Sequence, residues 1–128
     1  MDADVYQRLA MRTAGDMATS DPQDALIASA ALKDALIVSA LGLTGEAGEV
    51  AEVVKKHVAQ GHPLDRERLL LEAGDVAWYL ARLCTALDVP LSEVLRRNID
   101  KLSERYPDGF STQASLGRKE NGPTSGAS

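Results

Sequence analysis

Aromatic residues and cysteine are scarce in this chain. One tryptophan, one phenylalanine and three tyrosines are the only aromatic residues among 128, although 45% of the chain is hydrophobic. β-Sheets favour aromatic and β-branched side chains, so this composition favours packed helices over sheets. Cys84 is the only cysteine and has no partner for an intramolecular disulfide, which is typical of a reducing compartment.

Long apolar runs and blocks of basic residues are also missing. No apolar run approaches the roughly 20 residues that a membrane-spanning helix needs, and the acidic N-terminal segment MDADVYQRLAMR lacks the apolar core of a secretory signal. The net charge is −5, whereas binding to a nucleic-acid backbone requires clustered lysine and arginine. We therefore expect a cytoplasmic protein that binds neither a membrane nor a nucleic acid.

Prolines, glycines and capping residues divide the chain into helical segments. The pattern predicts helices over 3–18, from Asp21-Pro22 to about Gln60 with a break considered near 31–33, from Asp65 to about Leu87, and from Ser92 to Pro107. The expected fold is all-α, a bundle of four to five helices within a domain of residues 1–110. Residues 111–128 are rich in Ser, Gly, Thr and Lys, and we expect a flexible tail there.

Two acidic pairs lie inside the apolar helical patterns. Glu46 and Glu49 are three residues apart, as are Glu72 and Asp75, so the members of each pair share one helix face. On a helical wheel the first member falls at the edge of the apolar stripe and the second just beside it. Two such helices side by side would direct four carboxylates to one point.

A hard divalent cation would relieve the repulsion among these carboxylates, which is roughly 1 to 4 kcal/mol for each close pair. A set of oxygen ligands without His or Cys partners predicts Mg²⁺, or else Mn²⁺. The alternative is that Arg68, Arg82 and Lys56 neutralise the acids in structural salt bridges.

Glycines accompany both acidic pairs. Gly42, Gly45 and Gly48 form a row beside Glu49, and Gly74 precedes Asp75. A glycine inside a helix costs about 0.5–1 kcal/mol relative to alanine. The row therefore indicates a close approach, either by a ligand or by a neighbouring helix.

The last expected helix has a polar stripe of opposite charge. Asn98, Lys101 and Arg105 lie together at the edge of its apolar face. Cations and an amide are suitable partners for phosphate oxygens, although such a stripe is more often a solvated face.

Two aromatic residues follow the second acidic pair. Trp78 projects away from the acidic stripe, which favours a place in a subunit interface. Tyr79, one turn after Asp75, could line a base pocket or pack in the core.

Three segments together form a recognisable signature. Gly45-Glu46-Ala47-Gly48-Glu49 is followed after 22 residues by Glu72-Ala73-Gly74-Asp75, and the helical part ends with NIDKLSERYPDGFS at 98–111. The run from Leu41 to Phe110 thereby resembles the MazG-like, all-α nucleoside triphosphate pyrophosphohydrolases, whose metal motif is EExxE followed by ExxD. The chain departs from this motif at Gly45, where the family has its first Glu.

The resemblance implies an Mg²⁺-dependent enzyme that assembles as a homodimer or homotetramer. Such enzymes hydrolyse the α–β bond of a (d)NTP to (d)NMP and pyrophosphate and remove unwanted nucleotides from the pool. The implied metal ligands and catalytic residues are Glu46, Glu49, Glu72 and Asp75, where the metal would polarise the α-phosphate and activate a water molecule. Glu49 would accept the proton of that water. The implied phosphate-binding residues are Lys56, Asn98, Lys101 and Arg105.

Two other functions agree with the sequence. Phosphoribosyl-ATP pyrophosphohydrolases share the helical design of this superfamily, although the RYPDGF ending fits them less well. A catalytically silent helical module that binds a nucleotide or a protein partner is the other alternative.

Overall fold

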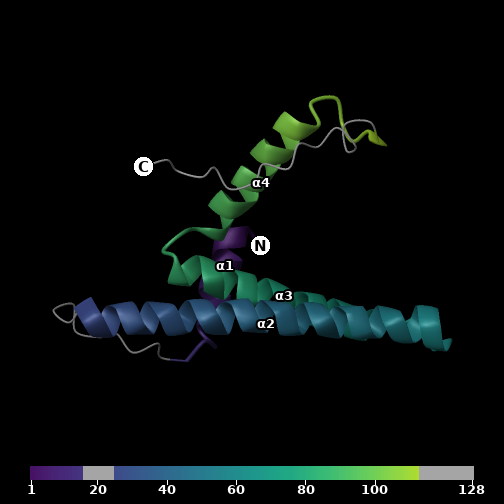
Figure 1. Cartoon of the computed structure of the whole chain (residues 1–128), viewed down its shortest axis with the longest axis horizontal. Coiled ribbons are helices and arrows are strands. Elements are labelled where there is room, and N and C mark those ends of the chain that lie inside the picture. Colours follow the sequence, from purple (N-terminus) through teal and green to yellow (C-terminus); the bar gives the residue numbers. More distant parts are fainter. Residues whose placement is uncertain (16–24, 113–128) are drawn as a thin grey trace, which may run out of the picture. The chain divides into compact units, whose positions relative to one another are not determined.

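The computed structural model describes residues 1–15 and 25–112, which form four α-helices and no strand (Figure 1). The helices are α1 (Ala3–Met11), α2 (Ala25–Gln60), α3 (Arg66–Ala86) and α4 (Leu91–Arg105). The prediction of an all-α fold is confirmed. The chain divides into two compact units, one comprising Met1–Val94 and the other beginning at Leu95.

The end of α2 and the start of α3 agree with the sequence signals. α2 ends before Gly61, whose φ of 71° is the left-handed conformation that glycine adopts without strain. α3 begins after Asp65, whose carboxylate accepts a hydrogen bond from the Arg68 backbone N–H at 3.0 Å. The considered break near 31–33 does not occur, since α2 is continuous there.

α1 is shorter than predicted. It begins after its N-cap Asp2 and ends at Met11, although the sequence predicted a helix as far as residue 18. Gly15 has a φ of 70°, which a continuing right-handed helix would not permit. The predicted cap at Asp21-Pro22 lies outside the described residues.

The predicted N-cap of α4 is wrong, because the helix already begins at Leu91 and Ser92 lies inside its first turn. Two side chains of α1 bind the free backbone N–H groups instead. Gln7 Oε1 accepts from Leu91 N at 2.7 Å, and Asp4 Oδ1 accepts from Ser92 N at 2.9 Å. The bonds from the Ser92 backbone and hydroxyl lower the pKa of Asp4. A cap supplied by residues far away in sequence satisfies the helix end as well as a local one does.

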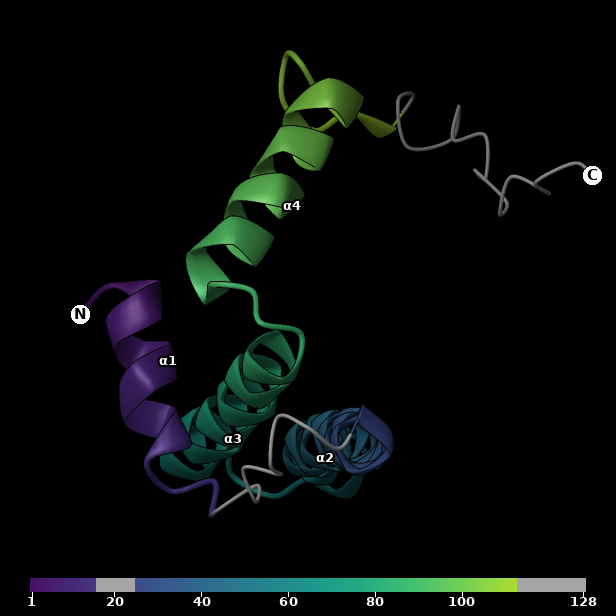
Figure 2. The same ribbon diagram turned by 90° about the vertical axis from the view of Figure 1, so that its left-hand side faces the viewer.

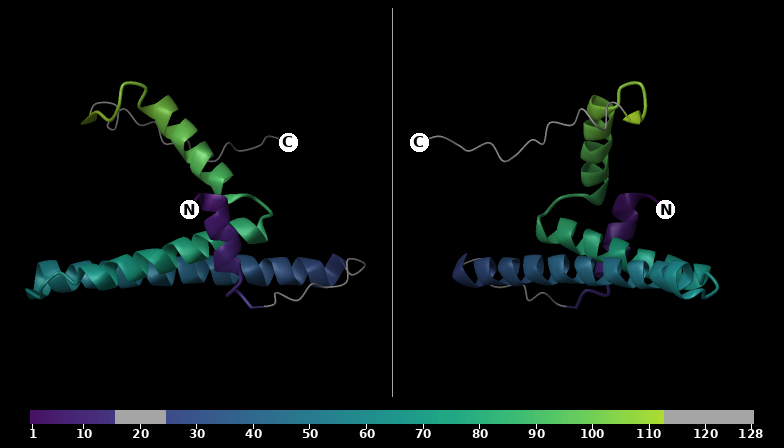
Figure 3. Two further views of the ribbon diagram at one scale, coloured as in Figure 1. Left: turned by 180° about the vertical axis from the view of Figure 1, so that it is seen from behind. Right: turned by 45° about the vertical axis from the view of Figure 1, so that its right-hand side comes forward.

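In the first unit, α2 and α3 form an antiparallel hairpin, and α3 lies between α2 and α1 (Figures 2 and 3). The core is built from small or medium side chains. Its buried hydrophobic members are Ala35, Val53, Ala81, Cys84 and Leu91. α1 covers part of this core with Tyr6, Ala10 and Met11.

Trp78 lies under α1. The place in a subunit interface that the sequence favoured for it stays a prediction. Its indole Nε1 donates to the Ala10 carbonyl at 3.1 Å and to Thr13 Oγ1 at 2.9 Å. A half-buried indole N–H requires such partners, and the last turn of α1 and the residues that follow it supply them. The contact joins α1 to α3 within a single chain.

The ring of Tyr79 fixes how α2 and α3 meet. A Cβ atom added at Gly42 would lie only 2.0 Å from a carbon of this ring, so the glycine leaves the space that the ring occupies. Gly45 and Gly48 differ, because no described atom lies within 4 Å of their Cβ positions. The close approach predicted for the glycine row therefore occurs at Gly42, where a side chain of the neighbouring helix fills it.

In the second unit α4 continues from Leu95 to Arg105, before Pro107 as predicted. Arg96 pairs with Asp100 at 2.5 Å, and the rings of Tyr106 and Phe110 lie 5.5 Å apart. The predicted domain of residues 1–110 stays a prediction, and most of the predicted tail, from residue 113, is outside the described residues. Within residues 1–15 and 25–112, no helix combines the length and apolarity that crossing a membrane demands.

Replacing Gly42 by alanine is expected to destabilise the fold by about 1–3 kcal/mol, because the added methyl group displaces the Tyr79 ring. Gly45→Ala is the matched control, since it adds the same atom to the same helix in open space and removes a helical glycine, with an expected gain of about 0.5–1 kcal/mol. Urea denaturation followed by circular dichroism measures both. A Gly42→Ala variant at least as stable as Gly45→Ala would contradict this interpretation of the contact.

Candidate functional site

Three carboxylates from two helices converge. Glu46 of α2 and Glu72 and Asp75 of α3 each offer a carboxylate oxygen, and these oxygens lie within 4.8 Å of one another. Glu46 and Glu72 are half-buried and Asp75 is exposed. The sequence predicted that four carboxylates would converge, and the structure brings together three of them, Glu46, Glu72 and Asp75.

The register of the hairpin accounts for the convergence. Glu46 follows Gly42 by four residues, about one turn along α2. Asp75 precedes Tyr79 by four residues, about one turn along α3. Because the helices run in opposite directions, the Tyr79–Gly42 contact sets Glu46 and Asp75 at the same level. The i, i+3 spacing then places Glu72 on the same face of α3 as Asp75.

Glu49 is not a member of this group of three and is bound to an arginine. Arg68 Nη2 lies 3.1 Å from Glu49 Oε2, and its Nε lies 3.0 Å from Glu72 Oε1. The hydrogen bond to Glu72, more than any other influence, raises the pKa of the Arg68 guanidinium. The salt-bridge alternative is thus correct for Arg68, which neutralises one carboxylate on each helix.

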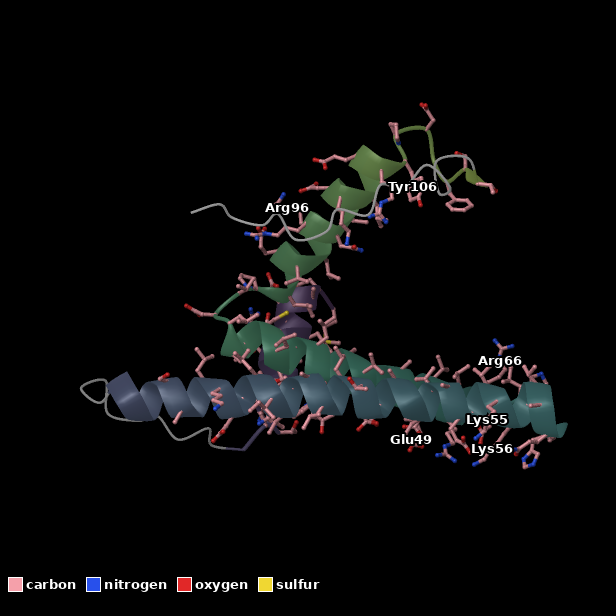
Figure 4. All side chains as sticks on the ribbon, viewed as in Figure 1. Glu49, Lys55, Lys56, Arg66, Arg96 and Tyr106 are labelled. Atoms are coloured by element: carbon pink, nitrogen blue, oxygen red, sulfur yellow. The ribbon has the colours of Figure 1, made fainter. Side chains whose placement is uncertain are left out.

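Lys56 and Arg82, the other two cations of that alternative, have contacts of their own. Lys56 lies 3.3 Å from Glu52, which also pairs with Lys55, and hydrogen bonds from these two lysines lower the pKa of Glu52. Glu49, Lys55 and Lys56 follow one edge of the C-terminal half of α2 (Figure 4). Arg82 lies over the ring of Trp78, 5.6 Å from its centre.

Tyr6 is a neighbour of the centre that the sequence did not indicate. Its hydroxyl donates to the Gly74 carbonyl at 3.4 Å. Burial raises the pKa of the Tyr6 phenol, and the nearby charge of Asp75 raises it further. In the sequence Tyr6 is only one residue of the first predicted helix, over 3–18. Its place follows from the packing of α1 on α3, which no local pattern indicated.

Tyr79, the candidate for a base pocket, packs against Gly42 and contacts Trp78 edge-on, with ring centres 4.9 Å apart. A role in base binding stays a prediction. Asn98, Lys101 and Arg105 are exposed residues of α4 in the second unit, and their phosphate-binding role also stays a prediction.

A pocket of about 270 Å³ lies beside the acidic residues and is connected to them through Arg68. Its lining is formed by Val53, Lys56, His62, Pro63, Asp65 and Arg68. A larger pocket of about 520 Å³ lies between α1 and the turn that joins α3 to α4. The described lining of the larger pocket includes none of the three clustered acids.

The three clustered carboxylates fit a hard divalent cation. They supply only oxygen ligands, and their position at the surface of the hairpin leaves room for water molecules and for a further ligand. Mg²⁺ typically retains several waters and binds through one or two carboxylates together with substrate phosphates, and Mn²⁺ accepts the same donors. The centre can therefore hold a metal ion that polarises a phosphate.

Comparison with known proteins shows which family the chain resembles. Residues 38–110 match the model of the MazG nucleotide pyrophosphohydrolase domain. The chain is also similar to the Gene 37 protein of Mycobacterium phage L5, with 45% identity over 73 residues. That match covers 54% of this chain and 64% of the phage protein, so the chain spans less than two thirds of this relative. No solved structure matches the chain.

Mg²⁺ is expected to raise the melting temperature of the protein, because an ion that binds only the folded state stabilises it. At about 100 times its Kd such an ion contributes about 2.7 kcal/mol, or a rise of roughly 10 °C for a domain of this size. Glu46→Gln and Asp75→Asn should each lose most of this rise. Glu67→Gln, which removes an acid of α3 outside the group of three, should retain it. Equal Mg²⁺-dependent rises in all four proteins, measured by differential scanning calorimetry, would exclude the centre.

Proposed function

Because the chain belongs to the MazG nucleotide pyrophosphohydrolase family, we propose that it is an Mg²⁺-dependent nucleoside triphosphate pyrophosphohydrolase. It cleaves the α–β bond of a (d)NTP to (d)NMP and pyrophosphate, and so removes unwanted nucleotides from the cytoplasmic pool. The observation that carries the proposal is the convergence of Glu46, Glu72 and Asp75 within the matched domain.

The proposed chemistry assigns a role to each side chain of the centre. Glu46, Glu72 and Asp75 would hold Mg²⁺ (or Mn²⁺). Glu49, which follows Glu46 by one turn of α2, orients the attacking water and accepts its proton. A bound ion would polarise the α-phosphate and make a nucleophile available near neutral pH.

The phosphate-binding residues complete the proposal. Lys56, Lys101 and Arg105 neutralise the phosphate groups, and Asn98 orients a phosphate or the sugar. Tyr79 contributes to a base pocket. The residue types support these roles, since ammonium, guanidinium and amide groups donate hydrogen bonds to phosphate oxygens.

We further propose that the chain works as a homodimer or homotetramer. The supporting observation is the exposure of large apolar side chains on the helical hairpin, where Leu41, Leu70 and Leu71 have 69%, 67% and 68% of their surface exposed. Large apolar side chains with this exposure are available for an interface with a second copy of the chain.

Activity on a panel of NTPs and dNTPs with Mg²⁺ tests the proposed function, with NMP and pyrophosphate measured separately. Removing a residue that only supports a metal ligand commonly reduces activity about 10–100-fold, so removing a ligand itself should lower kcat/KM by about 100-fold or more. We expect this decrease for Glu72→Gln and Asp75→Asn, and a near-normal rate for the control Glu67→Gln.

The products and the binding stoichiometry distinguish the alternatives. Release of phosphate without pyrophosphate would contradict cleavage of the α–β bond. Activity confined to phosphoribosyl-ATP would favour a phosphoribosyl-ATP pyrophosphohydrolase, and stoichiometric nucleotide binding without turnover would favour a silent binding module.

Light scattering on the full chain tests the assembly. We expect a mass of two or four times 13.7 kDa at micromolar concentration, and a lower mass for Leu41→Arg, because a charged side chain would have to be desolvated in the interface. A wild-type mass of 13.7 kDa would contradict the proposal.

A further inference from the structure

Arg68 joins the acidic centre to the neighbouring pocket. One side of its guanidinium contacts Glu72, a member of the group of three acids, and another nitrogen contacts Glu49 across the hairpin. The same side chain forms part of the wall of the pocket of about 270 Å³. A ligand bound partly at the acids and partly in this pocket would therefore lie next to the Arg68 side chain.

The lining of the pocket suits an anion. Lys56 and Arg68 supply two positive charges, and His62 adds an imidazole. Asp65 is the one acidic residue among the described residues of the lining, and its carboxylate accepts a hydrogen bond from the backbone N–H of Arg68 as the N-cap of α3. Val53 and Pro63 form the apolar part of the wall. The volume is ample for two linked phosphate groups but too small for a complete nucleotide.

The bond between Arg68 and Glu49 is of a kind that exchanges readily, whereas the Glu72 side chain, the other partner of Arg68, is only 16% exposed. The Arg68 side chain is 44% exposed and that of Glu49 is 52% exposed, and exposed ion pairs contribute little to stability. A divalent cation attracted to Glu72 competes with the guanidinium for the same carboxylate. A guanidinium released from a carboxylate can bind a phosphate with the same two-pronged geometry.

We propose that Arg68, with Lys56 and His62, forms a subsite for the β- and γ-phosphates, and that Arg68 exchanges its carboxylate partners for these phosphates when the substrate binds. Arg68 is then both a counter-ion of the acids in the free protein and a ligand of the leaving pyrophosphate. This subsite rests on the proposed function for its biological substrate, but its affinity for inorganic pyrophosphate can be measured without any turnover.

Isothermal titration of the full chain with inorganic pyrophosphate, at constant Mg²⁺, tests the subsite. We expect Arg68→Ala to weaken pyrophosphate binding about 10- to 100-fold, since the lost hydrogen bonds join charged groups. Arg68→Lys should bind with intermediate affinity, because an ammonium group cannot form two parallel bonds. The matched control is Arg66→Ala, an exposed arginine of the same helix that lies outside the pocket lining and points away from the edge that carries Glu49 and Lys56 (Figure 4), and it should bind as the wild type does.

A second titration, with Mg²⁺ alone, distinguishes this role from a purely structural one. Removal of Arg68 eliminates the competitor for Glu72, so Arg68→Ala should bind Mg²⁺ at least as tightly as the wild type while it loses pyrophosphate. A parallel loss of Mg²⁺ and pyrophosphate would show that Arg68 only holds the hairpin together and would overturn the proposal. If Arg68→Ala does not fold, Arg68→Lys and Lys56→Gln provide the same comparison.

Failure of the subsite and failure of the proposed function have different signatures. Unchanged pyrophosphate affinity in Arg68→Ala, or no pyrophosphate binding by the wild type, overturns the subsite even if the protein hydrolyses NTPs. Absence of NTP hydrolysis together with Arg68-dependent pyrophosphate binding overturns the proposed function and leaves the subsite supported.

Discussion

The ring of Tyr79 occupies the space that Gly42 leaves without a side chain, and this contact holds α2 and α3 in one register. A slip of one residue along either helix would rotate its acids by about 100° and separate them from those of the other helix. With the observed register Glu46, Glu72 and Asp75 meet at the surface of the hairpin. The geometry of the candidate centre thus depends on a steric fit one helical turn away from it.

The balance of charge around the acids explains why the centre is placed at the surface. Burying four carboxylates in a dry core would require a large desolvation free energy. At a half-exposed face of the hairpin, water screens the repulsion among them. Arg68 reduces the remaining cost by contacting Glu49 and Glu72 together. An exposed guanidinium is a weaker partner for a carboxylate than a divalent ion, so the arrangement is compatible with cation binding.

Local signals in the sequence were sufficient for α2, α3 and the acidic pairs. Asp65 caps its own helix and Gly61 ends the one before it, so their effects depend only on nearby backbone. The i, i+3 spacing of Glu72 and Asp75 likewise needs nothing beyond a helix. With two helices joined by a short turn, side-by-side packing of the acidic faces is one of few available arrangements.

Contacts between distant segments were not predictable in this way. Trp78 and Tyr6 have their partners 68 residues away, because α1 packs on α3. Glu49 was expected to join the other acids, but its pairing with Arg68 depends on side-chain positions across the hairpin, which a helical wheel does not describe. Ser92 is a residue type typical of an N-cap. The backbone N–H groups at the start of α4 instead donate to the side chains of Gln7 and Asp4 in α1.

The attachment of α1 to the start of α4 has a consequence for the order of folding. Gln7 is bonded to Thr85, Val89 and Leu91, which follow it by 78, 82 and 84 residues, whereas α2 and α3 are joined by a turn of only a few residues. Closing a short loop is entropically cheaper than closing a long one, so the hairpin forms early and α1 docks late. During synthesis α1 is therefore made before α2 and α3, but it docks only after these two helices have paired.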